Sequence, residues 1–320
     1  MSDKNKGLDF AAHPLVDAAW LAANLDAPGL RIIDSRWRGD GSANLLYQSG
    51  HIPGAVHLDW QTDLSYVRYG VDYLLLPPIR FTALMSSLGL GDDTRVIAYA
   101  DQDYSGAARL WWALRYYGHN QVGVLNGGMD HWLAAGFPVE TKTPIPAPVI
   151  FTPHPQPALL AKLPEIEAAI ANPDRPVRLI NTRPPEQFAG QAVWTPNGSL
   201  YLPQDLDWVA VKGRPMRGGH LPGAVHLVSS SLLDPLTWTF LEPDEILTRT
   251  QDLGIKPEER VITYCGCGLS ASLGLFALHL AGFKDLALYD GSWEEWGRDP
   301  DKPIERSTSG SAGVVPGMLG

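Results

Sequence analysis

Cysteine is scarce in this sequence: 320 residues contain only two, Cys265 and Cys267. Two thiols one residue apart cannot form the disulfide framework of a small secreted domain, so a reducing, cytoplasmic setting is expected. No apolar run reaches the roughly 18 residues that a spanning helix requires. The first residues, MSDKNK, are polar and predict no signal peptide.

Positive charge is also in short supply. Lys and Arg number 25 against 35 Asp and Glu, for a formal net charge of −10. This balance argues against nucleic acid or an anionic membrane surface as a partner. A small anionic substrate stays compatible with it, because the field inside a cleft differs from the net charge. The length suits two domains of about 150 residues each, and 45% hydrophobic residues can fill two cores.

Four segments of the first half recur in the second half in the same order, which identifies a tandem duplication. GHIPGAVHL at residues 50–58 recurs as GHLPGAVHL at residues 219–227. The other matching pairs are residues 31–36 with 178–183, 95–99 with 260–264, and 124–128 with 288–292.

Each copy alternates short apolar strands with helices, a pattern typical of an α/β fold with a mainly parallel sheet flanked by helices. Helices are predicted around residues 16–25, 80–88, 164–170 and 244–253, and strands at residues 31–34 and 177–181 and ending at Tyr99 and Tyr264. We predict domains at residues 8–141 and 159–303. A proline-rich, semi-rigid linker would span 142–158, and a flexible tail rich in Ser and Gly 304–320.

The most informative stretch is RVITYCGCGLSA at residues 260–271. It predicts a strand, a tight glycine loop and a helix over residues 270–280, with Gly282 as its C-terminal cap. Backbone N–H groups of such a loop converge with those of the helix N-terminus, so a thiolate at Cys265 would be stabilised as a nucleophile. The first copy has Ala100 there, followed by Asp101 and Asp103, and cannot run the same chemistry.

The two cysteines could also have a structural, metal-binding or redox role. Cys265 can be a small buried hydrophobe at the end of a strand. A zinc site needs four ligands, and no second cysteine pair exists, so no metal or other cofactor is expected. Redox dithiols are usually separated by two residues, and a disulfide between Cys265 and Cys267 would be strained. An alternative for Cys267 is a small side chain tolerated at a position that serine could also occupy; its role stays open.

A cysteine-dependent phosphatase also holds its nucleophile in an anion-binding loop. That chemistry calls for an arginine six residues after the cysteine, to grip the phosphoryl oxygens in a bidentate way. Position 271 is alanine. The sequence therefore disfavours phosphoryl transfer.

The two GH(I/L)PGAV turns, the strand–Cys–loop–helix unit and the ending YDGSWEEW at residues 289–296 resemble the tandem rhodanese family of thiosulfate and 3-mercaptopyruvate sulfurtransferases. The resemblance covers about residues 8–300. It implies two rhodanese-like domains, the N-terminal one inactive. It also implies a ping-pong reaction in which the cysteine takes a sulfane sulfur from a donor and passes it to a thiol or cyanide. A persulfide carrier that does not turn over is an alternative.

The resemblance also implies roles for individual residues. Cys265 matches the family's nucleophile, and its loop is formed by Gly266, Cys267, Gly268, Leu269 and Ser270. Asp59 matches an acidic residue that faces the active site in mercaptopyruvate enzymes. Arg214 lies near a family arginine that grips the donor's carboxylate. Three departures are Gln187 in place of a substrate-binding arginine, Cys267 in place of serine, and Leu74 in place of histidine.

The preferred donor stays open at this point. Loops of the thiosulfate type carry basic residues after the cysteine, whereas Gly266, Cys267 and Gly268 are neutral. The insertion at residues 190–217 could supply cations, with Lys212, Arg214 and Arg217 as candidates or as ordinary solvated charges. We expect Arg36 and Arg183 to anchor their own loops through salt bridges. His51 and His220 occur in both copies and are therefore expected to be structural.

Overall fold

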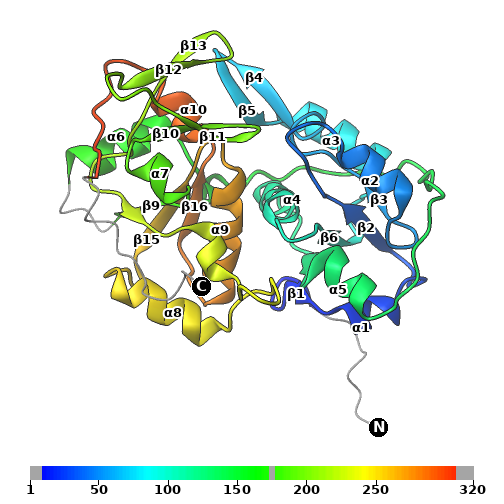
Figure 1. Ribbon diagram of the computed structural model, residues 1–320. Coiled ribbons are helices and arrows are strands. Elements are labelled where there is room, and N and C mark those ends of the chain that lie inside the picture. Colours follow the sequence, from blue (N-terminus) through cyan, green and yellow to red (C-terminus); the bar gives the residue numbers. More distant parts are fainter. Residues whose placement is uncertain (1–8, 173–176, 308–320) are drawn as a thin grey trace.

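The computed structural model describes residues 9–172 and 177–307, and two α/β halves lie side by side in it (Figure 1). Each half has a five-stranded parallel sheet. The N-terminal order is β1-β7-β6-β2-β3, formed by Leu15–Val16, Val122–Leu125, Arg95–Tyr99, Leu30–Asp34 and Val56–His57. The C-terminal order, from the opposite edge, is β8-β16-β15-β9-β14, formed by Leu160–Ala161, Leu286–Tyr289, Arg260–Tyr264, Val177–Asn181 and Val225–His226. Matching order and direction confirm the α/β prediction.

Helices cover both faces of each sheet. The N-terminal half contains α1 to α5, at Ala18–Ala22, Ala43–Ser49, Pro78–Ser87, Ser105–Tyr116 and Gly128–Ala134. The C-terminal half contains α6 to α10, at Leu163–Ala171, Pro185–Phe188, Pro243–Asp252, Leu269–Leu280 and Ser292–Trp296, with short 3₁₀ turns at Pro157–Leu159 and Ser229–Leu232. Gly282 follows α9 with φ 91°, the left-handed conformation expected of a residue that ends a helix.

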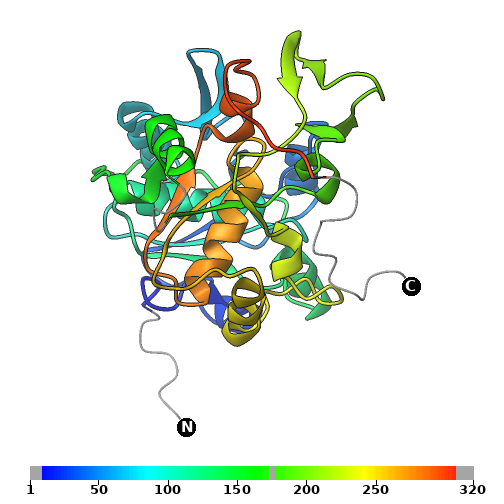
Figure 2. The same ribbon diagram turned by 90° about the vertical axis from the view of Figure 1, so that its left-hand side faces the viewer.

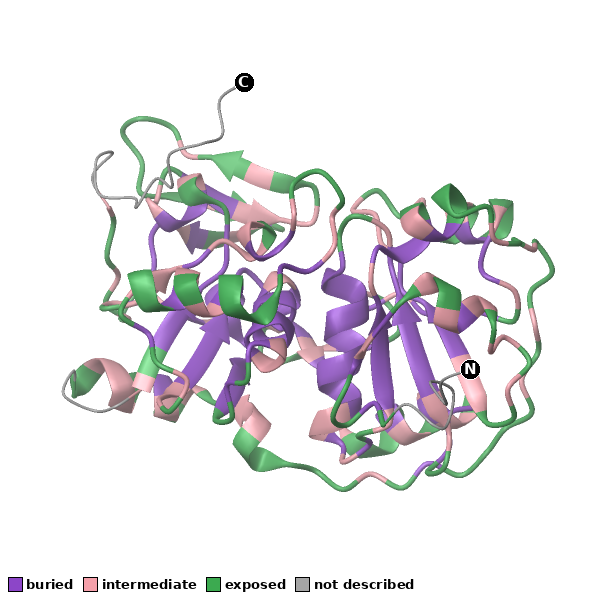
Figure 3. Cartoon of the chain, turned by 90° about the horizontal axis from the view of Figure 1, so that it is seen from below, coloured by how far each residue is buried: buried purple, intermediate pink, exposed green. Residues whose placement is uncertain are grey.

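The two halves meet through α4 and α9, which are buried along almost their whole length (Figure 3). Trp111 packs edge-on against Phe276, with ring centroids 4.8 Å apart, and Arg115 Nη1 lies 2.9 Å from His279 Nε2. A single hydrophobic cluster runs across both halves. The loop after β15, which leads into α9, is therefore close to the domain interface.

Three antiparallel hairpins extend from the sheets. They are β4–β5 at Ser65–Arg68 and Val71–Leu75, β10–β11 at Ala192–Thr195 and Gly198–Tyr201, and β12–β13 at Trp208–Val211 and Arg214–Arg217. Figures 1 and 2 show β4–β5 and β12–β13 at the same end of the molecule. The predicted insertion at residues 190–217 thus forms two ordered hairpins.

The described part of the segment predicted as a tail, residues 304–307, lies against the C-terminal half. Glu305 and His220 exchange two backbone hydrogen bonds, of 2.8 and 2.9 Å. Residues 308–320 of that segment lie outside the described residues. None of the helices in the part of the chain that the structure describes is long and apolar enough to cross a membrane.

Candidate active site

Cys265 begins the loop between β15 and α9, and the first turn of α10 fixes this loop. Cys265 N donates to Ser292 Oγ (3.1 Å), and Trp293 N donates to Cys265 O (3.0 Å). Gly268, the residue before α9, has φ 81°, which favours glycine. In the N-terminal half, Met129 N donates to Ala100 O (2.8 Å) in the same way. The first copy therefore keeps this loop anchor without the thiol.

The Cys265 side chain is only 2% exposed and is surrounded by hydrogen-bond donors. Burial by itself would raise the pKa of this thiol. Hydrogen bonds to the thiolate from the side chains of Cys267 and Ser270 and from the N–H groups of Ala271 and Cys267 outweigh burial and lower the pKa to about 5. Ala271, which replaces the phosphatase arginine, thus offers a backbone donor to the sulfur. These contacts favour a thiolate at neutral pH.

The low pKa gives a testable pH dependence. Because only the thiolate reacts, alkylation of Cys265 by iodoacetamide should be constant at neutral pH and fall about tenfold per pH unit below about pH 5. Ser270→Ala removes one donor to a charged sulfur, worth about 1.5–3 kcal/mol, and should raise the midpoint by about one to two pH units. Peptide mass spectrometry assigns the label to Cys265.

The matched control for that measurement is Ser87→Ala. Ser87 is an exposed serine on α3 whose hydroxyl donates to Leu84 O. Its substitution should leave the midpoint in place. A wild-type midpoint near the ordinary thiol range of about 8–9 would contradict the thiolate assignment.

The N-terminal half and the insertion form walls around the loop. Arg109 on α4 is fully buried and pairs with Asp290, Nη2 to Oδ1, at 2.5 Å. Its Nη1 lies 2.8 Å from the position that a Cβ atom would take on Gly268, so the guanidinium is close to the backbone of the loop. Trp194 on β10 lies against Gly266, so closely that a Cβ there would be 2.4 Å from the indole. Tyr73 on β5 meets Trp194 edge-on at 5.4 Å.

Sequence reasoning missed Arg109, Trp194 and Tyr73. For Arg109 a signal exists, because it is an arginine among Ala, Leu and Trp in the helix Ser105–Tyr116. Nothing in the local sequence places Trp194 or Tyr73 over this loop. Tyr73 does have φ 65°, an uncommon conformation for a non-glycine residue that is often found at functional sites.

Two of the cations of the insertion, Lys212 and Arg214, form ion pairs with carboxylates. Arg214 Nη2 lies 3.0 Å from Asp72 and 3.1 Å from Glu294, and Nη1 donates to Gly70 O. Lys212 Nζ lies 3.2 Å from Asp72 and donates to Tyr73 Oη at 2.5 Å. The structure thus places Arg214 and Lys212 at the junction of β5, β13 and α10, with carboxylate partners.

Arg217 has a different environment. Its guanidinium donates to backbone carbonyls of the segment after α10, including Lys302 O at 2.9 Å. Gln187 is buried and donates to Ser199 Oγ at 2.9 Å. These contacts hold the base of the insertion against the C-terminal half.

Asp59 is partly buried and bonds within its own turn. Its carboxylate accepts from Gln61 N at 2.8 Å, and its backbone N–H donates to Asp63 at 2.9 Å. Among the described residues it makes no hydrogen bond or ion pair with the loop from Cys265 to Ser270. Leu74 lines a separate cavity of about 480 Å³ between the two halves, which Cys265 does not line.

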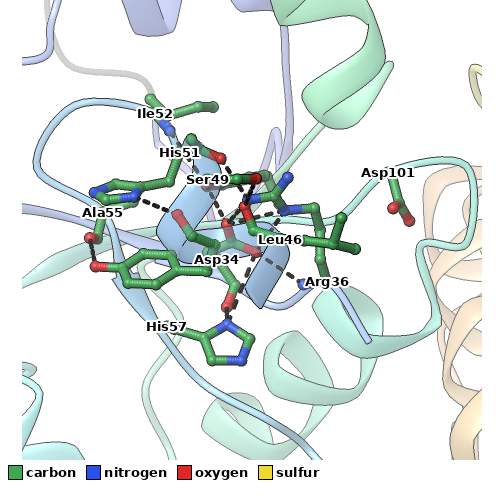
Figure 4. Close-up of polar contacts among 12 residues, drawn as sticks. Asp34, Arg36, Leu46, Ser49, His51, Ile52, Ala55, His57 and Asp101 are labelled. Atoms are coloured by element: carbon green, nitrogen blue, oxygen red, sulfur yellow. Dashed lines mark hydrogen bonds and ion pairs between the residues drawn. The ribbon is translucent and has the colours of Figure 1, made fainter. Parts of the chain in front are cut away.

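The anchoring arginines differ between the copies. Arg36 forms a buried salt bridge with Asp34 at 2.6 Å and donates to Gly50 O, as expected (Figure 4). The prediction that Arg183 forms a salt bridge is wrong. Position 181 is asparagine, so within the described residues Arg183 has no carboxylate partner; it donates to Gly219 O and stacks over Trp293, 4.6 Å from the ring centroid. Burial lowers the pKa of Arg183 to about 10.

The repeated histidines have structural contacts. His51 Nδ1 lies 2.8 Å from Tyr47 O (the ring is seen in Figure 4), and His220 Nδ1 lies 2.8 Å from Phe188 O. Both side chains are buried. Within the described residues, no group of three His, Cys, Asp or Glu side chains could hold a metal ion.

Comparison with known proteins places this arrangement in a family. The model of the rhodanese-like domain matches residues 17–135 and again residues 163–299. The chain belongs to the rhodanese family. As a tandem rhodanese it is related to the thiosulfate and 3-mercaptopyruvate sulfurtransferases, which confirms the resemblance predicted from its motifs.

Two curated relatives and one solved structure illustrate this relationship. A putative thiosulfate sulfurtransferase, SseA, of Mycobacterium bovis is 35% identical over 325 residues, which is 99% of this chain and 98% of the relative. A 3-mercaptopyruvate sulfurtransferase of Escherichia coli is 30% identical over 302 residues, 91% of this rhodanese and 97% of the relative. The crystal structure of the Escherichia coli 3-mercaptopyruvate sulfotransferase SseA superposes with a TM-score of 0.74 at 27% identity, covering 88% of this chain and 98% of that one.

Proposed function

We propose that this rhodanese transfers sulfane sulfur through a persulfide on Cys265. The observation that carries the proposal is the set of donors around Cys265, which lowers the pKa of its thiol to about 5. Four donors that stabilise a thiolate can also stabilise the terminal sulfur of Cys265–S–S⁻, as an oxyanion hole stabilises an oxyanion. The loop from Gly266 to Ser270 supplies most of them.

The reaction has two halves. With thiosulfate, the thiolate attacks the outer sulfur and sulfite leaves with the bonding electron pair. With 3-mercaptopyruvate, the thiolate takes the mercapto sulfur and the departing carbon is protonated, giving pyruvate. A thiol or cyanide then attacks the terminal sulfur and regenerates the Cys265 thiolate.

The charges around the loop favour the donor with the smaller charge. Lys212 and Arg214 share Asp72, and Arg214 also faces Glu294. Arg109 is neutralised by Asp290. Glu294 is also paired with Arg298, and Arg183, which has no carboxylate partner among the described residues, interacts with the Cys265 thiolate and offsets that charge. A dianion such as thiosulfate needs more positive charge than these groups leave, whereas 3-mercaptopyruvate carries a single carboxylate. We therefore propose 3-mercaptopyruvate as the better donor.

The test compares kcat/KM for the two donors, measuring sulfite from thiosulfate and pyruvate from 3-mercaptopyruvate with one common thiol acceptor. We expect 3-mercaptopyruvate to be preferred by at least about tenfold, which corresponds to about 1.4 kcal/mol of transition-state stabilisation. Equal values, or a preference for thiosulfate, would overturn the donor assignment. A persulfide that forms on Cys265 without turnover would instead indicate a sulfur carrier.

A further inference from the structure

The hairpin β10–β11 extends from the C-terminal half to the N-terminal half (Figure 1). Its base is fixed to the C-terminal half by Gln187, which donates to Ser199 Oγ at 2.9 Å. Its turn meets the other half at Gly39, where Pro196 O leaves no room for a Cβ atom. The backbones of the two halves are therefore in direct contact at the end of this hairpin.

Trp194, on the first strand of this hairpin, lies on the loop that contains the nucleophile. A Cβ atom on Gly266, the residue after Cys265, would be 2.8 Å from Cδ2 of the indole, so the ring rests directly on the loop backbone. The N-terminal half supports the indole from the side. Tyr73 meets it edge-on at 5.4 Å, and Trp60 packs on Tyr73 at 5.6 Å. Cys265 itself is only 2% exposed.

This arrangement matters most for the second half of the reaction, in which an acceptor thiol takes the sulfur. The step is Cys265–S–S⁻ plus RSH giving Cys265–S⁻ plus RSSH. The acceptor sulfur bonds to the terminal sulfur, the S–S bond to Cys265 breaks, and its electron pair stays on Cys265 Sγ. Rates of such exchange depend on access to the sulfur that is attacked. An acceptor with a large body must therefore approach past whatever lies on the loop.

We propose that Trp194 is a specificity-determining residue that restricts the acceptor to small nucleophiles, such as cyanide or a two-carbon thiol; this rests on the proposed function. The indole is packed between Gly266 below it and Tyr73 beside it, so it is not a freely rotating surface side chain. A thiol that carries a peptide body collides with this ring, whereas a small one passes it. The persulfide is thereby protected from discharge by bulky thiols.

The test measures how fast two thiols of different size discharge the persulfide. Each protein is first loaded with 3-mercaptopyruvate or thiosulfate, freed of donor by gel filtration, and then mixed with 2-mercaptoethanol or glutathione. Intact mass follows the loss of the extra sulfur. The ratio of the two rate constants is compared between proteins, so the intrinsic reactivities of the two thiols cancel. In Trp194→Ala the preference for 2-mercaptoethanol should fall at least about tenfold, because glutathione reacts faster.

Trp194→Phe is the second variant, because its ring still packs on Tyr73 but covers less of the loop. It should give an intermediate ratio, and it carries the comparison if thermal unfolding shows that Trp194→Ala does not fold. The matched control is Trp208→Ala. Trp208 lies on β12, is 43% exposed and should leave the ratio unchanged.

The two proposals fail in different ways. A ratio in both loaded Trp194 variants that stays within about twofold of the wild-type value overturns the role of Trp194 alone. Failure of the wild type to gain the mass of one sulfur from either donor overturns the proposed sulfur transfer, and the acceptor restriction with it.

Discussion

Cys265→Ser is expected to reduce sulfur transfer from both donors by at least about 10³-fold. The serine hydroxyl keeps the shape of the side chain but does not ionise near neutral pH, so the donors of the loop have no thiolate to stabilise. The N-terminal half offers no thiol in its place, because its corresponding position is Ala100. The measurement is the first product, pyruvate or sulfite, in a single turnover, together with the intact mass.

The matched change for Cys265→Ser lies two positions along the loop. Cys267→Ser keeps Cys265 and should still release the first product in a single turnover. Circular dichroism and thermal unfolding show whether both variants keep the fold. If Cys265→Ser still transferred sulfur from both donors, the assignment of Cys265 as the nucleophile would be wrong.

The sequence predicted the scaffold because its signals are local and occur twice. The repeated strand RVI(A/T)Y and the repeated GH(I/L)PGAV turn identified both halves. The change from β-branched residues to small apolar ones after Cys265 predicted the strand–loop–helix unit, and the structure has β15 and α9 there. Such signals depend on backbone preferences and on the spacing of apolar residues, which a single sequence shows directly.

The surroundings of the loop could not be predicted in the same way, because they come from distant segments. Trp194 meets the loop from a hairpin of the insertion and Arg109 meets it from α4, while Tyr73 packs on Trp194 from a hairpin of the other half. Each contact depends on how the two halves pack. The same applies to Arg214, whose carboxylate partners Asp72 and Glu294 are far from it in the sequence.

The duplication explains how a copy without the cysteine can still serve the site. In both halves the strand that precedes the loop is paired in parallel on each side, and a buried helix follows the loop. The N-terminal copy has Ala100 at the position of the thiol, and its loop carboxylate Asp101 pairs with Arg38. Its helix α4 instead presents Arg109 to the loop of the other copy. The N-terminal domain thus contributes a buried cation rather than a nucleophile.

The buried ion pair between Arg109 and Asp290 should contribute strongly to stability. Arg109→Met is expected to lower the free energy of unfolding by about 3–5 kcal/mol, because it leaves the buried carboxylate of Asp290 without its partner. Asp290 is 6% exposed and accepts a hydrogen bond from Leu75 N at 2.8 Å, so its charge cannot turn to water without breaking that bond. Urea unfolding followed by tryptophan fluorescence measures the change.

A double variant separates the charge from the packing. Arg109→Met with Asp290→Asn removes both charges but keeps an oxygen for Leu75 N, so it should recover more than half of the lost stability. Arg80→Met, at an exposed position on α3, is the matched control and should change stability by less than about 0.5 kcal/mol. A double variant no more stable than Arg109→Met would show that the lost contacts of Arg109 with Trp112 and Tyr73, and not the unpaired charge, account for the effect.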